Sequence, residues 1–166
     1  DDYFEKNKIE KIINFYSKNK EINAIYDLPI LVKGKKKKIV KNKKKFFNTF
    51  WPYIPPQSCI SIRRRSFRKY VKYINFKLFP NIWMDFRLAM YLKYIEKNFF
   101  IFNENLTYYR QNINSISSNF KFSSVNWWKR RLEAYEYIKY FFNINKISYK
   151  KNFDYYLTVV INSLLK

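Results

Sequence analysis

The first apolar residues of the chain recur at helical spacing. Apolar positions three and four residues apart predict an amphipathic helix with one side turned toward a core. Two aspartates precede this segment, as suits the positive end of a helix dipole, and the helix should end near Asn19. Its apolar side would consist of Phe4, Ile9, Ile12, Ile13 and Tyr16.

A strand and a strongly basic segment should follow this helix. Residues 24–26 indicate a short strand, and residues 28–32 lead into Gly34, which stands inside a run of lysines. Because like charges repel one another, such a run predicts a mobile solvated loop or the tip of a hairpin. The lysines concerned are Lys33, Lys35, Lys36, Lys37 and Lys38, and then Lys41, Lys43, Lys44 and Lys45.

The rest of the chain alternates short strands with helices. An aromatic stretch punctuated by prolines predicts a loop over 46–56. The helix predicted over 84–97 would carry one apolar side made of Met84, Leu88, Tyr91, Leu92 and Ile95. The pattern also predicts a strand over 59–62, a strand pair within 99–109 around the turn-like Asn103–Asn105, and helices over 63–71, 125–142 and 153–165.

This order predicts an α/β fold with a helical tail. We expect a mixed α/β domain over residues 1–118 and a helical extension over 119–166, without internal repeats. The longest apolar stretch, 155–165, is too short and too interrupted to cross a bilayer. The chain is therefore expected to be soluble or to lie on a membrane surface.

Charge widens the range of partners. The chain carries 34 Lys and Arg against 12 Asp and Glu, a formal net charge of +22, and 22% of its residues are aromatic. Basic surfaces with interleaved aromatic rings are typical of nucleic-acid binding. The same surplus suits an anionic lipid surface or a nucleoside diphosphate. It also follows from AT-rich coding, which enriches Lys, Asn, Ile, Phe and Tyr together.

The rare residue types exclude several kinds of site. One cysteine and no histidine rule out an internal disulfide, a Cys/His zinc site and a Ser-His-Asp triad within this chain. Proton transfer must then depend on a carboxylate, a lysine or a tyrosine. Gly34 is the only glycine, so a glycine-rich phosphate cradle is either absent or outside this chain.

Three blocks, in this order, resemble the family-2 (GT-A type) sugar-nucleotide glycosyltransferases. Their order and spacing carry the resemblance, which extends over about residues 1–118, because each motif alone is weak. The blocks are Asp1-Asp2-Tyr3-Phe4 with the helix after it, Pro55-Pro56-Gln57-Ser58-Cys59-Ile60-Ser61-Ile62-Arg63-Arg64, and Trp83-Met84-Asp85-Phe86 with Glu104-Asn105-Leu106-Thr107-Tyr108-Tyr109-Arg110-Gln111 and Asn114-Ser115.

The first block implies a metal site. Asp1 and Asp2 match the last two acidic positions of the family's Asp-x-Asp-Asp run, which binds the cation that neutralises the donor diphosphate. Mg²⁺ or Mn²⁺ would be that cation, since hard cations take carboxylate oxygens. The plain alternative is that both aspartates only cap the following helix.

The other two blocks imply an acceptor side. Arg63 and Arg64 match the family's "Arg-Arg-Ser" segment and would contact a phosphate-bearing ligand, or else form a solvated basic helix face. Asp85 matches the acidic position used as catalytic base, although a helix N-cap is the alternative. Arg110 would pair with diphosphate or form a structural salt bridge, and Asn112 stands where the family often has histidine.

The resemblance implies a partial GT-A fold that lacks the N-terminal βαβ portion. The expected function is sugar transfer from a nucleotide-sugar donor to a glycan or lipid-linked acceptor in cell-surface polysaccharide synthesis, at a cytoplasmic location. We expect little or no activity from these 166 residues alone. The alternatives are a basic nucleic-acid-binding protein and a non-catalytic remnant that binds a partner; a transferase would bind nucleic acid without specificity.

A basic aromatic segment opens the long helix near the C-terminus. Trp127, Trp128, Lys129, Arg130 and Arg131 would either pack a core-facing helix with a basic flank or attach the chain peripherally to an anionic membrane.

Overall fold

The computed structural model describes residues 2–41, 51–74, 77–112 and 120–165. These residues form two compact units. The first comprises Asp1–Ile74 with Met84–Asn112, and the second comprises Asn75–Trp83 with Ile113–Lys166. The segment Asn75–Trp83, which we expected in the first domain, therefore groups with the C-terminal helices.

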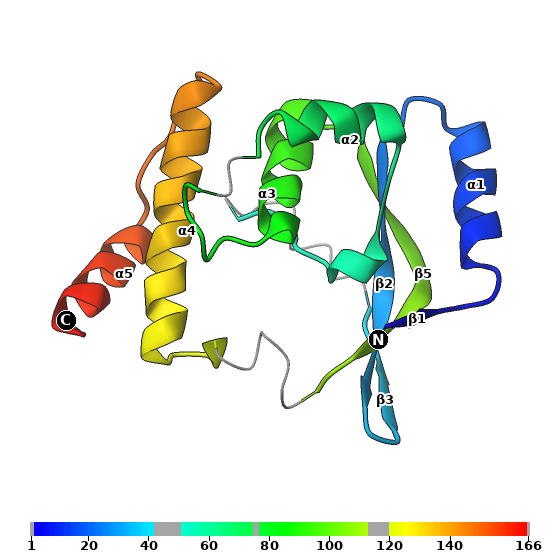
Figure 1. The fold of residues 1–166 in the computed structure, drawn as a ribbon, viewed down its shortest axis with the longest axis horizontal. Coiled ribbons are helices and arrows are strands. Elements are labelled where there is room, and N and C mark those ends of the chain that lie inside the picture. Colours follow the sequence, from blue (N-terminus) through cyan, green and yellow to red (C-terminus); the bar gives the residue numbers. More distant parts are fainter. Residues whose placement is uncertain (1, 42–50, 75–76, 113–119, 166) are drawn as a thin grey trace. The chain divides into compact units, whose positions relative to one another are not determined.

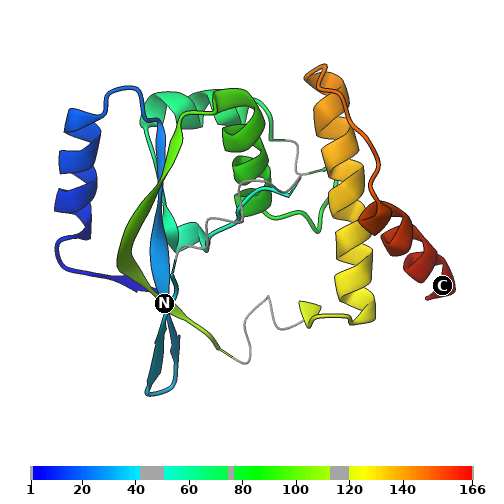
Figure 2. The same cartoon turned by 180° about the vertical axis from the view of Figure 1, so that it is seen from behind.

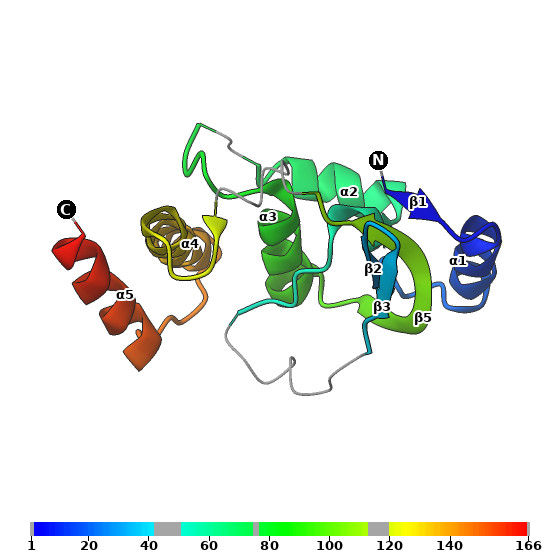
Figure 3. The same ribbon diagram turned by 90° about the horizontal axis from the view of Figure 1, so that it is seen from below.

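The first unit is a mixed sheet with helices on both faces (Figures 1 and 3). Helix α1 covers one face, and α2 and α3 cover the other. The sheet has the order β1-β5-β2-β3, and β4 pairs with β2. Its elements are β1 (Tyr3–Phe4), α1 (Lys8–Lys18), β2 (Ala24–Lys33), β3 (Lys36–Ile39), β4 (Ile60–Ile62), α2 (Arg64–Val71), α3 (Met84–Tyr91) and β5 (Phe99–Arg110).

Alternation along β2 serves both faces of the sheet. Ala24, Tyr26 and Leu28 belong to a core shared with buried residues of α2, α3 and β5. Asp27 has the opposite parity and meets α1 through Lys8, whose Nζ lies 2.9 Å from its Oδ1. The central strand β2 is thus buried on both sides, and its parallel neighbour β5 follows the crossover that contains α2 and α3.

Several predicted elements are confirmed. The lysine run forms the β2–β3 hairpin, and Gly34 takes a left-handed φ of 57° at its turn. A short 3₁₀ turn, Gln57–Cys59, leads into β4, and α2 follows directly. The helix predicted over 84–97 is α3 continued by a π-helical segment, Leu92–Glu96. Lys43, Lys44 and Lys45 lie outside the described residues.

Three predictions about the first unit are wrong. The region 99–109 is a single strand, β5, and not a strand pair with a turn at Asn103–Asn105. Phe4 lies in β1, not on the helix, and pairs with Thr107 of β5. On α1, Ile12 is buried whereas Ile9 and Ile13 are exposed, because the side of α1 that faces the sheet also carries Lys8.

The second unit is built on two helices, α4 (Val125–Ile144) and α5 (Phe153–Leu164), as predicted (Figure 2). Ser124 caps α4 by accepting the N–H of Trp127, and Asn152 caps α5 by accepting the N–H of Tyr155. Aromatic side chains on one side of α4 are buried, and Phe79 packs edge-on against Tyr137. In the described ranges, no helix is both long enough and apolar enough to cross a bilayer.

Candidate functional site

The sheet brings two of the predicted site residues together. Antiparallel pairing of β1 with β5 places Tyr3 opposite Tyr108. Just beyond that pair, one residue before Tyr3 and two residues after Tyr108, the backbone N–H of Arg110 donates to Asp2 Oδ1 over 2.9 Å. The first sequence block and the strand part of the third block therefore meet at one end of the sheet. Asp1 lies outside the described residues.

Aromatic rings and cations form a row at this end of the sheet. The rings of Tyr3 and Tyr108 stack with centroids 4.4 Å apart and planes 6° from parallel. The Arg110 guanidinium lies 5.3 Å from the Tyr3 centroid, and Lys37 Nζ lies 4.9 Å from the Tyr108 centroid. Such stacks hold cations in place beside an aromatic surface. We refer to Tyr3, Lys37, Tyr108 and Arg110 as the cation–aromatic row.

The carboxylate of Glu5 holds one ring of the cation–aromatic row in place. The hydroxyl of Tyr108 donates to Glu5 Oε1 over 2.5 Å. This bond, followed by desolvation and the charge of Glu5, raises the pKa of Tyr108, so the phenol stays neutral at physiological pH. Tyr108 therefore acts as a donor and a stacking surface, and the charges of the row are those of its two cations.

A hollow of about 400 Å³ opens beside the row, lined by Tyr3, Val32, Gly34, Arg110 and Asn112. Its residues converge because β2 and β5 run parallel, with Val32 opposite Arg110. At Gly34, no heavy atom lies within 4 Å of where a Cβ would stand, so the glycine is required by its backbone conformation and not by close packing. The hollow is thus lined by one cation, Arg110, and one aromatic ring, Tyr3.

The β2–β3 hairpin adds positive charge next to this hollow. All residues of β3 are exposed, as are Lys33 and Lys35 at its turn. Five lysines within six positions, together with Arg110, give this end of the sheet an electropositive surface. Its chemistry suits a diphosphate or another compact anion.

A buried ion pair supports the site from beneath. Lys8 Nζ lies 2.9 Å from Asp27 Oδ1 and also donates to the carbonyl of Ser58 (2.7 Å) and to Thr107 Oγ1 (2.6 Å). Thr107 donates in turn to Asp27 Oδ2 over 2.5 Å. Burial raises the pKa of Asp27, while the hydrogen bonds from Thr107 and Lys8 oppose that rise. The network joins α1 to β2 and β5.

Cys59 lies beside this network and is inert by its environment. Its side chain is buried, and burial, assisted by the charge of Asp27, raises the pKa of the thiol to about 12. It therefore remains a protonated thiol and fills space where the resembled family often has glycine.

The two arginines of the second block have different surroundings. Arg63 binds carbonyl groups at and just after the C-terminal end of α1. Its Nε donates to the Ile22 carbonyl (2.8 Å), and its Nη2 donates to the carbonyls of Tyr16 (2.7 Å) and Asn19 (3.2 Å). The guanidinium also stacks on Tyr16 at 4.3 Å. These contacts give Arg63 a structural role that neither sequence interpretation foresaw. Arg64 is exposed on the first turn of α2.

Asp85 lies in the first turn of α3 and is half-buried. Its Oδ1 accepts the N–H of Phe86 over 2.7 Å, a contact that holds the carboxylate at the positive end of the helix. It is inside the helix, so it is not the N-cap residue. Asp85 belongs to the crossover between β4 and β5, and not to the strands that form the β1–β5 junction.

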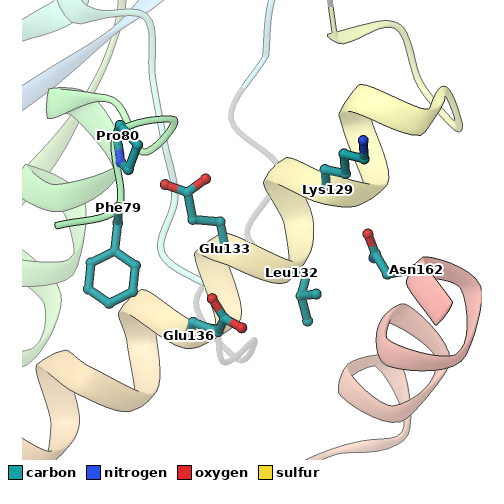
Figure 4. Close-up of a pocket in the computed structure, with 7 residues that line it drawn as sticks. All are labelled: Phe79, Pro80, Lys129, Leu132, Glu133, Glu136 and Asn162. Carbon is teal, nitrogen blue, oxygen red and sulfur yellow. The ribbon is translucent and has the colours of Figure 1, made fainter. Parts of the chain in front are cut away.

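The second unit contains a separate hollow of about 480 Å³. Figure 4 shows four of its lining residues along α4 and Asn162 on α5. Both carboxylate oxygens of Glu133 are occupied by Asn81, whose N–H donates over 2.9 Å and whose Nδ2 donates over 2.6 Å. These contacts give Glu133 a role in holding the segment 77–83 against α4. The hollow is lined by Phe79, Pro80, Lys129, Leu132, Glu133, Glu136 and Asn162.

The aromatic opening of α4 mostly packs within its own unit. Trp127 contacts the rings of Phe122 and Trp128. Arg130 stacks on Trp83 at 3.5 Å, and Arg131 pairs with Asp154. These contacts agree with a core-facing helix that carries a basic flank.

Comparison with known proteins adds no relative. No family model, no curated protein and no solved structure matches this chain. The α/β class is a property of the structure itself, whereas the glycosyltransferase resemblance rests on the sequence blocks alone.

Proposed function

We propose that this chain is the acceptor-side part of a family-2 glycosyltransferase of the GT-A type. The observation that carries the proposal is the meeting of Asp2 with Arg110, since these residues come from the first and the third of the three blocks and lie 108 positions apart. An accidental resemblance gives no reason for these blocks to share one end of a sheet. The hollow and the basic hairpin at that end supply the chemistry that a diphosphate requires.

The residues present fit a cation shared with a substrate better than one held by the protein alone. In the described ranges, no cluster of three or more acidic, histidine or cysteine side chains could enclose a metal ion. Mg²⁺ at phosphate sites commonly takes one or two carboxylates, with phosphate oxygens and water completing the shell. Asp2, with Asp1 beside it in the sequence, would provide those carboxylates. The bound cation would offset charge on the leaving diphosphate.

The remaining roles follow from charge and position. Arg110, supported by the Lys37 side of the row, would bind the diphosphate through charge-assisted hydrogen bonds. Asp85 would accept the proton of the acceptor hydroxyl as that oxygen attacks the anomeric carbon and the nucleoside diphosphate leaves. Attack opposite the leaving group inverts the anomeric centre. The acceptor would be a glycan or a lipid-linked sugar, in a cytoplasmic setting.

Calorimetric titration of the chain with UDP and with GDP, each with and without Mn²⁺, tests this proposal. We expect binding that requires Mn²⁺ and that weakens about tenfold or more in Asp2→Asn and in Arg110→Gln. The matched control is Arg68→Gln, which removes the same charge from an exposed position on α2. Equal binding by all four proteins would contradict the proposed site.

The same titration separates the transferase from its main alternative. A nucleic-acid-binding protein would bind single-stranded RNA or DNA far more tightly than either nucleotide, with a steep dependence on salt and none on Mn²⁺. That outcome would favour the alternative, which the net charge alone supports.

A further inference from the structure

Helix α5 is amphipathic, but it buries polar residues and exposes apolar ones, the opposite of a surface helix in a water-soluble domain. Its polar residues Thr158 and Asn162 are buried, with 0% and 6% of their surface exposed. Asn162 Nδ2 donates to the Trp128 carbonyl of α4 over 3.0 Å, and Thr158 Oγ1 donates within the helix to the Asp154 carbonyl. The polar side thus faces the other helix of its unit.

The apolar side of α5 is exposed. Its residues recur three and four positions apart, so they form one continuous stripe along the helix. Water-soluble proteins seldom expose such a stripe, and contiguous apolar surface of this kind marks a contact site. The stripe consists of Phe153 (80% exposed), Tyr156 (55%), Leu157 (39%), Val160 (54%) and Leu164 (80%).

Charge indicates what covers this stripe. Asp154 is the only acidic residue of α5, and its carboxylate is engaged by Arg131 and by the hydroxyl of Tyr135, both on α4. The segment before the helix carries exposed Lys150 and Lys151. The stripe is therefore bordered by positive charge, and its one carboxylate is paired away from it. A second copy of the chain would add another formal net charge of +22, which opposes self-association, whereas an anionic surface would complement the lysines.

We propose that α5 is an interfacial membrane helix that inserts its apolar stripe among anionic lipids. A twelve-residue helix rises about 18 Å, so it would lie in the plane of the interface and would not cross the bilayer. Lys150 and Lys151 bind lipid phosphates beside it. This moves the membrane contact anticipated for the Trp127 segment to α5, and it does not depend on sugar transfer.

Flotation of the whole chain with vesicles tests the proposal. The vesicles are phosphatidylcholine with about 30% phosphatidylglycerol, compared with phosphatidylcholine alone. The wild-type chain should float with the anionic vesicles and much less with the neutral ones. Val160→Ser combined with Leu164→Ser should weaken partitioning at least about tenfold.

The matched control is Ile9→Ser combined with Ile13→Ser, which removes two exposed aliphatic side chains (62% and 59%) from α1 in the other unit. It should float like the wild type, and circular dichroism should show both variants to be folded. Equal flotation of the α5 variant would overturn the proposal. So would a dimer of the wild-type chain that the α5 variant converts to monomer without any vesicle binding, since that result assigns the stripe to a second copy. Nucleotide binding is unaffected by either outcome.

Discussion

Replacing Lys8 with methionine would leave the Asp27 carboxylate buried without its cation. The side chains of Lys8 and Asp27 are 4% and 0% exposed, and Thr107 also donates to this carboxylate. Removing one partner from a buried pair leaves an uncompensated charge and costs about 3–5 kcal/mol. We expect Lys8→Met to lower the free energy of unfolding at pH 7 by that amount.

The loss should depend on pH with a definite sign. Burial already raises the pKa of Asp27 in the folded chain, so the folded state binds this proton more tightly than the unfolded state. The resulting stabilisation is complete below the ordinary pKa of aspartate and disappears as the pH rises through the raised value. Removing Lys8, which opposes that rise, shifts the folded pKa further upward. The deficit of Lys8→Met should therefore be largest near neutral pH and shrink as the pH falls.

Urea denaturation followed by circular dichroism at several pH values measures this deficit. Lys11→Met is the matched control, because Lys11 lies on the same helix and pairs with Glu104 at 2.5 Å on the surface, with side chains 39% and 42% exposed. A surface pair of this kind contributes about 0–1 kcal/mol. If Lys8→Met behaved like Lys11→Met, with a small deficit that did not change with pH, the buried-pair reasoning would be refuted.

Three further predictions concern the same unit. Arg63→Gln should lower the free energy of unfolding by about 1–3 kcal/mol, because the carbonyls at the end of α1 lose a charged donor. Arg64→Gln should change it by less than about 0.5 kcal/mol, and urea titration of both variants checks this. Cys59 should not react with a thiol reagent until the chain is unfolded, since its pKa is raised to about 12, and fast labelling of the native chain would contradict this. Gly34→Ala should cost about 1–2 kcal/mol in the same urea assay through backbone strain at φ 57°, and an unchanged midpoint would argue against that turn.

Local periodicity was sufficient for much of the fold. The predicted side of the helix over 84–97 lines the core as expected: Leu88, Tyr91 and Leu92 are buried there, and Met84 and Ile95 pack against it. Such elements are predictable because a helix that buries one side needs apolar residues at that spacing and little else.

Strand β5 could not be predicted in the same way. The polar run at Asn103–Asn105 has turn composition, yet the Asn105 amide donates to the carbonyls of Pro29 (3.1 Å) and Val40 (2.9 Å). The register of β2 against β5 shifts beside this point, between Leu28 and Pro29. Tertiary hydrogen bonds thus keep a turn-like sequence extended, which no local pattern reveals.

The candidate site shows the same division. The three blocks identified Asp2 and Arg110 as site residues from the sequence. The roles of Tyr3 and Tyr108, which stand within the blocks, and of Lys37 became visible only through strand register. Lys8 lies four residues before Ile12, so helical spacing places it on the same buried side of α1. Its partner Asp27 could be found only from the side of β2 to which that side chain points. The role of Arg63 is set by carbonyl groups forty or more positions away, beyond the reach of any motif.

Paramagnetic broadening by Mn²⁺ tests the central claim most directly. With UDP or GDP present, trace Mn²⁺ should broaden the amide signals of Asp2, Tyr3 and Arg110 first, because the proposed cation lies at the β1–β5 junction. Asp2→Asn should abolish that selective broadening. Broadening centred instead on Glu133 and Glu136 of the second unit, or absent from the junction at saturating nucleotide, would contradict the account.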